Sequence, residues 1–265
     1  MGRLLLLEEL LPAVVDVEVP ASGGSGVILD PSGIAATCRH IVGSTTKAKV
    51  CLRDGSHVPA RPVLSLRGSD LTFLLLPPHP RSGATRASDT ESTYLALPLA
   101  TEREIVLGAE VYAIGSPAGL SQTVSRGIVS RIDCRTPGHT LIQTDASMSP
   151  GSSGGPLITR SGHLAGICAG GYTAIPGINF AIALRPLQAV ISGLRSKLAS
   201  LADPTYCPTC GHLGGTPRGF CGACGTAKGL VGALEIPCAC CCARNPWSRS
   251  YCSRCGAELE ADDSA

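Results

Sequence analysis

Short apolar segments separated by turn residues recur through most of this chain. Between residues 13 and 182 they follow one another roughly every ten residues, which is the spacing of an all-β sandwich or barrel. The clearest of them are residues 14–19, 26–30, 110–115, 140–145 and 163–170. The chain has 32 glycines and 20 prolines to supply turns, and only 3% of its residues are aromatic. The sequence therefore predicts a mainly β domain with a core of Val, Ile, Leu and Ala.

A helix is predicted after the strands, where the apolar period changes. Six apolar residues then fall on one helical face. They are Leu187, Val190, Ile191, Leu194, Leu198 and Leu201. Asp203-Pro204 should end this helix, because a proline disfavours helical backbone in the residue before it. Residues 77–93, rich in Pro, Ser, Thr and Arg, predict an exposed loop.

The first 19 residues predict a short amphipathic helix that runs into the first strand. Residues 4–7 resemble the start of a signal peptide, but Glu8 and Glu9 interrupt the apolar run and no small-residue cleavage site follows. No stretch approaches the ~18 apolar residues of a membrane-spanning helix. We therefore expect a cytoplasmic protein without a membrane span. A net charge of +2 argues against both a nucleic-acid coat protein and a membrane-surface protein.

Residues 151–157, Gly-Ser-Ser-Gly-Gly-Pro-Leu, place two serines in a glycine cluster between a polar turn and an apolar strand. A serine hydroxyl becomes an effective nucleophile when a base takes its proton and amide donors await the oxyanion. Glycines let the backbone bend so that N–H groups beside the serine converge on one point. Taken alone, the segment fits an ordinary Gly/Ser turn equally well. The choice depends on whether a histidine and an aspartate occur upstream in matching contexts.

Both residues are present. His40 follows a strand–turn–strand pattern within residues 24–42, and Asp70 stands at the head of the apolar run 69–77. A lone histidine near an apolar strand is more often a packed or surface residue than a base, and such an aspartate is usually a turn residue. With Ser153, however, they occur in the order His, Asp, Ser. A carboxylate rooted in a buried strand can hold the imidazole tautomer and stabilise the imidazolium.

Several segments of the chain match one protein family in sequence and in order, and together they support a more specific resemblance. They are residues 24–42, 69–77, 113–132, 142–157 and 177–191. Over residues 8–195 the chain resembles the HtrA/Deg group of trypsin-like serine proteases. The resemblance implies serine endopeptidase activity and a chymotrypsin-like double six-stranded β-barrel with a C-terminal helix. The PDZ domain common in that family is not expected, because a cysteine-rich segment occupies its place.

The resemblance also assigns a role to each residue of the candidate site. His40 is the general base, Asp70 orients it and Ser153 is the nucleophile. The backbone N–H groups of Gly151 and Ser153 form the oxyanion hole. The glycine frame selects Ser153 rather than the adjacent Ser152 as the nucleophile.

Two positions depart from the family pattern. Ser152 stands where the family usually has Asn or Asp. Arg39 stands where a small residue usually precedes the histidine, and its charge either acts on His40 or points to solvent.

The resemblance bounds the primary substrate pocket as well. Ser147 corresponds to the base of that pocket and supplies no carboxylate, so a preference for Arg or Lys before the scissile bond is not expected. The facing strand comprises Ile178, Asn179, Phe180 and Ala181. Bound substrate would pair beside it as an added β-strand. We expect small or medium apolar side chains before the scissile bond, and a structural role for Asp145.

The 14 cysteines are distributed unevenly, and their pattern defines a second domain. Cys38, Cys51, Cys134 and Cys168 are scattered, as is usual for buried small hydrophobes. The other ten lie between residues 207 and 255, where a C-x2-C pair followed ten residues later by another C-x2-C pair occurs twice. The expected organisation is a first domain at 1–202, a linker at 203–206 and a double ribbon at 207–259, with ribbons at 207–225 and 238–256.

Two C-x2-C knuckles supply the four thiolates of a tetrahedral zinc site, and metal binding would stabilise a module too small to bury a core. The resemblance to double zinc ribbons implies one structural Zn²⁺ per unit and no metal in catalysis. The first site would comprise Cys207, Cys210, Cys221 and Cys224, and the second Cys238, Cys241, Cys252 and Cys255. Cys240 and Cys242 are left over as spectators, alternative ligands or oxidation-sensitive thiols. An iron–sulfur cluster and a disulfide scaffold are the alternatives.

The leading hypothesis is an intracellular serine endopeptidase acting on proteins or peptides, with ribbons that dock a partner or substrate. The alternative is a catalytically silent scaffold that binds a protein or nucleic acid through the ribbons. The presence of all three triad residues favours the enzyme, because these groups act as a unit. The ribbon segment also holds cations and aromatics, namely Arg218, Lys228, Arg244, Arg249, Arg254, Trp247 and Tyr251. Such scattered cations are more typical of a solvated surface, so nucleic acid is not the expected partner.

Overall fold

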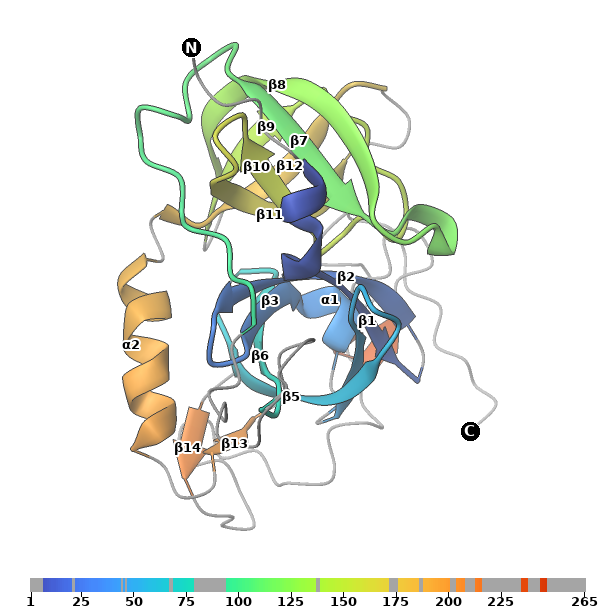
Figure 1. Cartoon of the computed structure of the whole chain (residues 1–265), viewed down its shortest axis with the longest axis vertical. Helices are drawn as coiled ribbons and strands as arrows, with labels where there is room; N and C mark the ends of the chain where they lie inside the picture. The colour runs from blue at the N-terminus through green and yellow to red at the C-terminus, as the bar shows by residue number, and fades with distance from the viewer. Residues whose placement is uncertain are drawn as a thin grey trace.

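The strands of the described residues form two closed six-stranded barrels and two separate hairpins (Figure 1). This computed structural model describes residues 7–20, 22–43, 45, 47–66, 69–78, 94–136, 139–171, 176–185, 188–200, 204–207, 213–215, 235–237 and 244–246. The predicted exposed loop at 77–93 lies almost entirely outside these residues. The prediction of a mainly β fold with two barrels and a C-terminal helix is confirmed.

The first barrel has the strand order β1-β2-β3-β6-β5-β4. Its strands are β1 (Val14–Val19), β2 (Ser22–Asp30), β3 (Ile34–Cys38), β4 (Ala48–Cys51), β5 (His57–Ser65) and β6 (Leu71–Leu75). Strand β3 is buried along its whole length and contacts β11 of the second barrel. Because both of its faces are covered, its sequence Ile-Ala-Ala-Thr-Cys does not alternate between apolar and charged residues.

The second barrel has the order β10-β11-β12-β9-β8-β7, again with antiparallel neighbours. Its strands are β7 (Glu110–Gly115), β8 (Thr123–Thr136), β9 (His139–Thr144), β10 (Pro156–Thr159), β11 (Leu164–Gly171) and β12 (Asn179–Ala183). Each of the five segments predicted as strands overlaps a strand of the two barrels. Figure 1 shows the barrels stacked, with β2 and β3 facing the second barrel.

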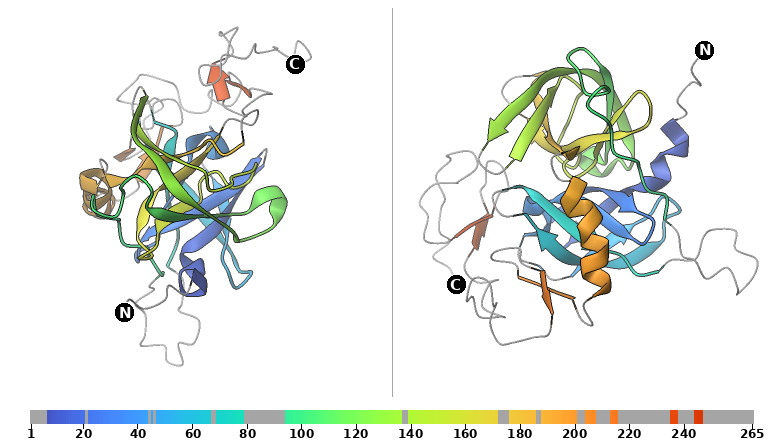
Figure 2. Two further views of the ribbon diagram at one scale, coloured as in Figure 1. Left: turned by 90° about the horizontal axis from the view of Figure 1, so that it is seen from above. Right: turned by 90° about the vertical axis from the view of Figure 1, so that its left-hand side faces the viewer.

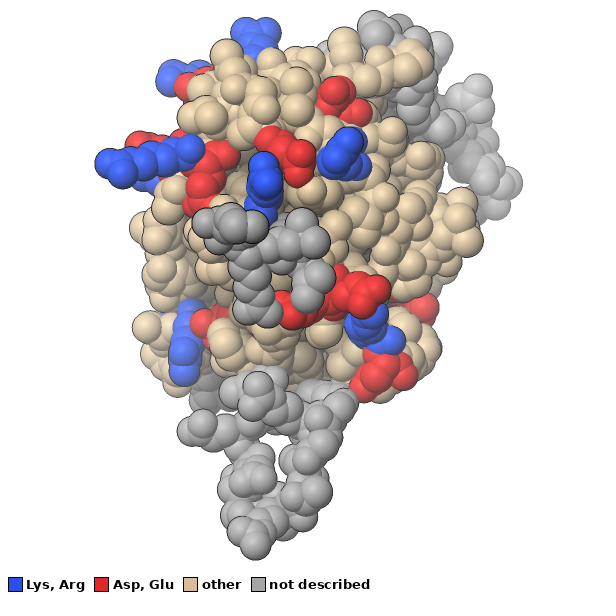
Figure 3. Space-filling model, turned by 45° about the horizontal axis from the view of Figure 1, so that its top comes forward, with Lys and Arg blue, Asp and Glu red and all other residues tan. Residues whose placement is uncertain are grey.

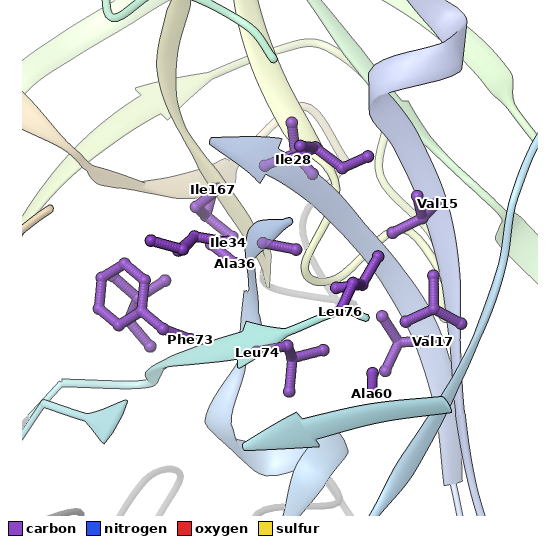
Figure 4. Close-up of a cluster of buried hydrophobic side chains, with 14 of the residues drawn as sticks. Val15, Val17, Ile28, Ile34, Ala36, Ala60, Phe73, Leu74, Leu76 and Ile167 are labelled. Carbon is purple, nitrogen blue, oxygen red and sulfur yellow. The ribbon is translucent and has the colours of Figure 1, made fainter. Parts of the chain in front are cut away.

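The core is aliphatic, as the composition predicts. Phe73 is the largest fully buried side chain of the described residues, and the other large ones are Ile or Leu. Figure 4 shows Phe73 and Ile34 beside Ile167, which comes from β11. The first apolar cluster therefore continues from the first barrel into the second, and this shared core fixes the barrels against each other. A second cluster, which includes Val111, fills the rest of the second barrel.

The N-terminal prediction of one amphipathic helix running into the first strand is wrong for the described residues 7–13. Two 3-10 turns, η1 (Leu7–Glu9) and η2 (Leu11–Ala13), precede β1 instead. Pro12 explains the difference, because it has no N–H to donate to an upstream carbonyl and it starts a new turn rather than continuing one.

Helix α2 (Gln188–Ala199) is the predicted C-terminal helix, and it lies alongside the first barrel (Figure 2). Leu194 is buried, and Ile191 and Leu198 pack partly buried against the same cluster. Val190 is exposed, so the apolar stripe is narrower than predicted. The helix ends at Ala199, before the expected Asp203-Pro204 stop, while Leu187 and Leu201 lie outside the described residues.

Neither a membrane-spanning helix among the described residues nor a single sign of charge on the face drawn in Figure 3 is seen. Within the described ranges no helix is long and apolar enough to cross a bilayer. On the face in Figure 3, acidic and basic side chains are interspersed rather than gathered by sign. The described residues on that face therefore form no basic stripe of the kind typical of nucleic-acid binding.

Glu104 and His163 form a hydrogen-bonded pair at the second barrel. His163 Nδ1 lies 2.7 Å from Glu104 Oε1, and the N–H and hydroxyl of Thr101 both donate to Glu104 Oε2 at 2.8 Å. Partial burial alone would raise the pKa of the Glu104 carboxyl. The hydrogen bonds from Thr101 and His163, with the charge of His163, outweigh burial and lower this pKa to about 2.

Replacing Glu104 by glutamine is expected to lower the free energy of unfolding at pH 7 by on the order of 2 kcal/mol. A carboxyl with a lowered folded-state pKa stabilises the fold above its unfolded pKa, and this contribution is lost as the pH falls from about 4.5 towards 2. Urea unfolding of both proteins at several pH values should show the difference shrinking over that interval. A difference independent of pH would contradict the assignment.

Candidate active site

His40 and Asp70 meet because of the register of two neighbouring strands. Cys38, the last residue of β3, pairs with Leu71, the first residue of β6. Helix α1 (Arg39–Val42) starts directly after β3 and carries His40, while Asp70 stands directly before β6. His40 Nδ1 lies 2.7 Å from Asp70 Oδ2. The pair predicted from sequence order is therefore a close contact.

Backbone contacts hold both partners in place. The N–H of His40 donates to Asp70 Oδ1 at 2.9 Å, and the N–H of Arg39 donates to the Asp70 carbonyl at 3.0 Å. The side chains of His40 and Asp70 are only 11% and 19% exposed. Because an ionised carboxylate can only accept, Nδ1 of the neutral imidazole carries the proton and Nε2 presents a lone pair. Arg39 itself is half-buried.

The segment 149–155, called the serine loop below, can be formed only with glycine at two positions. Gly151 has φ of +101° and Gly154 has φ of +89°. A Cβ on Gly154 would lie 2.0 Å from the carbonyl oxygen of Ser25. The glycines around the two serines therefore meet a backbone requirement, as the sequence pattern predicts.

Some backbone N–H groups of the serine loop donate hydrogen bonds within the protein, and others do not. Those of Ser152, Gly154 and Gly155 donate to the carbonyls of Ser149, Cys168 and Ser152, respectively. Across the described part of the chain, the N–H groups of Gly151 and Ser153 have no acceptor. These are the two donors assigned to the oxyanion hole. A backbone oxyanion hole requires two open N–H donors of this kind.

Ser25, on β2, anchors the serine loop, although no sequence pattern predicts this role. Its N–H donates to the Ser153 carbonyl at 2.9 Å, and its hydroxyl donates to the Gly151 carbonyl at 2.7 Å. The same hydroxyl accepts from the N–H of Ser116 at 2.9 Å, and Thr37 donates to the Ser25 carbonyl at 2.7 Å. A fully buried serine of the first barrel thus positions the loop of the second.

Ser153 lies next to the helix that carries His40. A Cβ on Gly24 would be 2.3 Å from the Ile41 side chain and 3.0 Å from the Ser153 carbonyl, so Ile41 and Ser153 flank the same point of β2. Ser153 is half-buried, and its hydroxyl makes no hydrogen bond to a described residue. Such bonds are often long or misaligned before substrate binds.

Of the candidate pocket residues, Asn179, Phe180 and Ala181 lie in β12, Ile178 directly precedes it, and Ser147 follows the end of β9. Asn179 is 9% exposed and donates through Nδ2 to the Ala146 carbonyl at 3.0 Å. It pairs with Gly171 across β11 and β12, and a Cβ on Gly171 would lie 2.3 Å from Asn179 Oδ1. The Asn179 side chain thus spans the space between Gly171 and Ala146. Ser147 is exposed.

The remaining residues predicted to line the pocket differ in how deeply they are buried. Ile178 and Phe180 are half-buried, whereas Ala181 is fully buried in the second core cluster. Asp145 Oδ1 accepts the N–H of Ile128 at 2.7 Å, a contact with the backbone of β8. Of the scattered cysteines, Cys38 and Cys168 are buried as expected, and the other two are half-buried.

The C-terminal cysteines lie mostly outside the described residues. Cys207 is described and buried, whereas the positions of Cys210, Cys221, Cys224, Cys238, Cys240, Cys241, Cys242, Cys252 and Cys255 are not. Short hairpins nevertheless flank both units. Strands β13 (Pro204–Tyr206) and β14 (Leu213–Gly215) form the first, and β15 (Glu235–Pro237) and β16 (Arg244–Pro246) the second.

The two hairpins have the same register relative to their cysteines. Pro204 pairs with Gly215 and Glu235 pairs with Pro246. β13 ends immediately before Cys207, and β15 ends immediately before Cys238. The sequence repeat is therefore also a repeat of local backbone structure.

Comparison with known proteins agrees with the geometry. The trypsin-like peptidase domain family matches residues 24–167. The putative serine protease HhoA of Synechocystis is 33% identical over 64% of this chain and 42% of its own length. The serine endoprotease DegS of Haemophilus influenzae is 36% identical over 60% of this chain and 46% of its own. The chain spans less than half the length of these curated relatives.

A solved structure gives the same result. The crystal structure of the serine endoprotease from Yersinia pestis superposes with a TM-score of 0.57 at 32% identity. The match covers 72% of this chain and 64% of that one. The two barrels, the placement of His40 and Asp70, and the shared sequence all point to one origin. The chain therefore belongs to the trypsin-like peptidase family, with a protease domain of the HtrA/Deg type.

Proposed function

We propose that the chain is a serine endopeptidase that cleaves peptide bonds in protein or peptide substrates. The observation that carries the proposal is the pair of open N–H groups at Gly151 and Ser153, held in a loop beside the His40–Asp70 pair. Trypsin-like family membership supports it. A hydrogen-bonded His–Asp pair alone could be structural, but a purely structural pair gives no reason for two open N–H donors in the neighbouring loop.

In the proposed mechanism His40 Nε2 takes the proton of the Ser153 hydroxyl as Oγ attacks the scissile carbonyl. The imidazolium that forms is stabilised by Asp70, and the oxyanion receives hydrogen bonds from Gly151 and Ser153 N–H. His40 then protonates the leaving amine. A water molecule, deprotonated by the same imidazole, hydrolyses the acyl-enzyme and restores Ser153.

A fluorophosphonate probe followed by peptide mass mapping tests this function. The expected result is a single adduct on Ser153, formed much more slowly in the His40→Ala variant. A folded protein that forms no adduct would support the scaffold alternative instead. Thermal unfolding of the same samples distinguishes an inactive protein from an unfolded one.

We further propose that the Asn179 side chain limits the depth of the pocket that receives the substrate side chain before the scissile bond. Its amide is fixed by the hydrogen bond to Ala146 and lies across the gap towards Gly171. A substrate side chain entering between the two strands would meet this amide before reaching Ser147. This arrangement supports cleavage after small residues, a narrower expectation than the one drawn from Ser147 alone.

Replacing Asn179 by glycine should shift specificity towards larger side chains. We expect kcat/KM for substrates with Leu or Met before the scissile bond to rise at least tenfold relative to Ala, because a few added methylenes gain 1–3 kcal/mol once space exists. Hydrolysis of a matched peptide series measures the ratio. Asn179→Ala should give an intermediate shift. An unchanged ratio in both variants would exclude Asn179 as the pocket-closing residue.

We also propose that the C-terminal cysteines bind two structural zinc ions and that the ribbons dock a protein partner or substrate. Four thiolates per unit, with Cys207 buried directly after β13, suit a closed tetrahedral site. The matching register of the two hairpins supports two equivalent sites. Zinc would contribute folding free energy there and take no part in catalysis.

Metal analysis of the full chain is expected to give two zinc ions per molecule. Cys207→Ser and Cys238→Ser occupy equivalent positions in the repeat, so each variant should lose one ion. Thiol titration under denaturing conditions provides the control, because a disulfide scaffold would leave few free thiols and little zinc. Iron with visible absorption would instead indicate a cluster.

A further inference from the structure

Cys38 places a thiol beside the His40–Asp70 pair. It is fully buried at the end of β3, and its partner across the ladder is Leu71, the neighbour of Asp70. One ligating atom each from Cys38, His40 and Asp70 lies within 4.8 Å of those of the other two. The thiol donates to the Cys168 carbonyl at 3.2 Å, the carbonyl that also accepts the N–H of Gly154.

Thiolate, imidazole and carboxylate are the three ligand types that zinc prefers in proteins. A tetrahedral ion with ordinary bond lengths holds such atoms about 3.3–3.6 Å apart. The cluster therefore needs modest side-chain rotations, which bring the sulfur closer and widen the His40–Asp70 contact. Both His40 and Asp70 are partly exposed, so a cation can reach the cluster from solvent.

The charge of the cluster also suits a divalent cation. A thiolate at Cys38 and a carboxylate at Asp70 together carry two negative charges, and neutral His40 adds none. A bound divalent ion makes the cluster neutral, which limits the cost of burying charge. Water can occupy the fourth position on the solvent side.

We propose that Cys38, His40 and Asp70 form an inhibitory site for a thiophilic divalent cation such as Zn²⁺ or Cd²⁺; its effect on catalysis rests on the protease function proposed above. Binding releases the thiol proton of Cys38 to solvent. Binding at Nδ1 also requires the other tautomer of the neutral His40 imidazole, so the single ring proton moves from Nδ1 to Nε2. That nitrogen then has no lone pair for the Ser153 proton, and the nucleophile stays inactive.

The test measures peptide hydrolysis by the full chain, with its C-terminal cysteines already zinc-loaded, in zinc buffers set by a chelator. Cys38→Ser is the informative variant, because serine keeps a donor for the Cys168 carbonyl and is a poor ligand for soft cations. Inhibition relative to each protein's own zinc-free rate should require at least tenfold more zinc in this variant. Cys134→Ser, a half-buried thiol on β8, should match the unmodified chain. Equal inhibition of all three proteins would overturn the proposal.

Direct binding separates this inference from the protease function. Cadmium added to the full chain should produce more ultraviolet cadmium–thiolate absorption than in Cys38→Ser, by one thiolate per molecule. If the chain hydrolyses nothing but this difference appears, the cation site stands and the proposed function fails. If the chain hydrolyses peptides but the difference is missing, the cation site is wrong. Cys38→Ala serves the same comparison should Cys38→Ser not fold.

Discussion

Alanine in place of Ser153 is expected to lower kcat for peptide hydrolysis by about 10⁶-fold, to the residual rate that binding and the oxyanion donors support. The change removes only the attacking oxygen. The N–H of residue 153, its carbonyl bond from Ser25 and the two positive-φ glycines remain. Kinetics on a peptide substrate, with unfolding curves of both proteins, measure the effect and show that the fold persists.

Ser152→Ala is the matched control, since the two serines are adjacent and both sit within the glycine frame. The Ser152 hydroxyl accepts the N–H of Ser149 at 3.3 Å and is nearly buried, so its loss should reduce the rate less than tenfold. The fluorophosphonate adduct should persist in this variant and vanish in Ser153→Ala. The reverse outcome would make Ser152 the nucleophile and would require a different reading of the loop.

The sequence predicted the features that depend on short-range interactions, namely short strands and the backbone of the serine loop. The strands at 14–19 and 110–115 coincide with β1 and β7, because alternation and turn residues set short strands largely by themselves. The serine loop was predictable because left-handed backbone at Gly151 and Gly154 excludes most other residues. The boundaries that failed, at Pro12 and at the end of α2, depended on tertiary packing or on a single missing N–H.

Contacts between distant segments could not be predicted in the same way. Ser25 anchors the serine loop across 126 residues of sequence, and a serine within a Gly-rich strand carries no signal of that role. Asn179 was placed in the pocket by resemblance, but its reach to Ala146 follows from the pairing of β11, β12 and β9. The His163–Glu104 pair, 59 residues apart, belongs to no motif and was missed.

Comparison with the His163–Glu104 pair shows why Asp70 is assigned the orienting role. The two His–carboxylate contacts are alike in geometry. Each has an Nδ1–oxygen distance of 2.7 Å. Only the His40–Asp70 pair lies beside the open donors of the serine loop. Distance alone therefore does not identify the functional pair, whereas the surroundings of His40 do.

Asp70→Asn is accordingly expected to lower kcat by about 10⁴-fold with little change in the free energy of unfolding. The asparagine oxygen can still accept the N–H of His40, but the amide donates to Nδ1 and leaves the proton on Nε2, where it blocks attack by Ser153. Glu104→Gln makes the same chemical change at the other pair and should do the opposite, lowering stability while kcat stays within about twofold. Rates and urea unfolding of both variants decide the matter. Comparable loss of activity in both, or an active Asp70→Asn enzyme, would mean that the imidazole tautomer at His40 does not control the reaction.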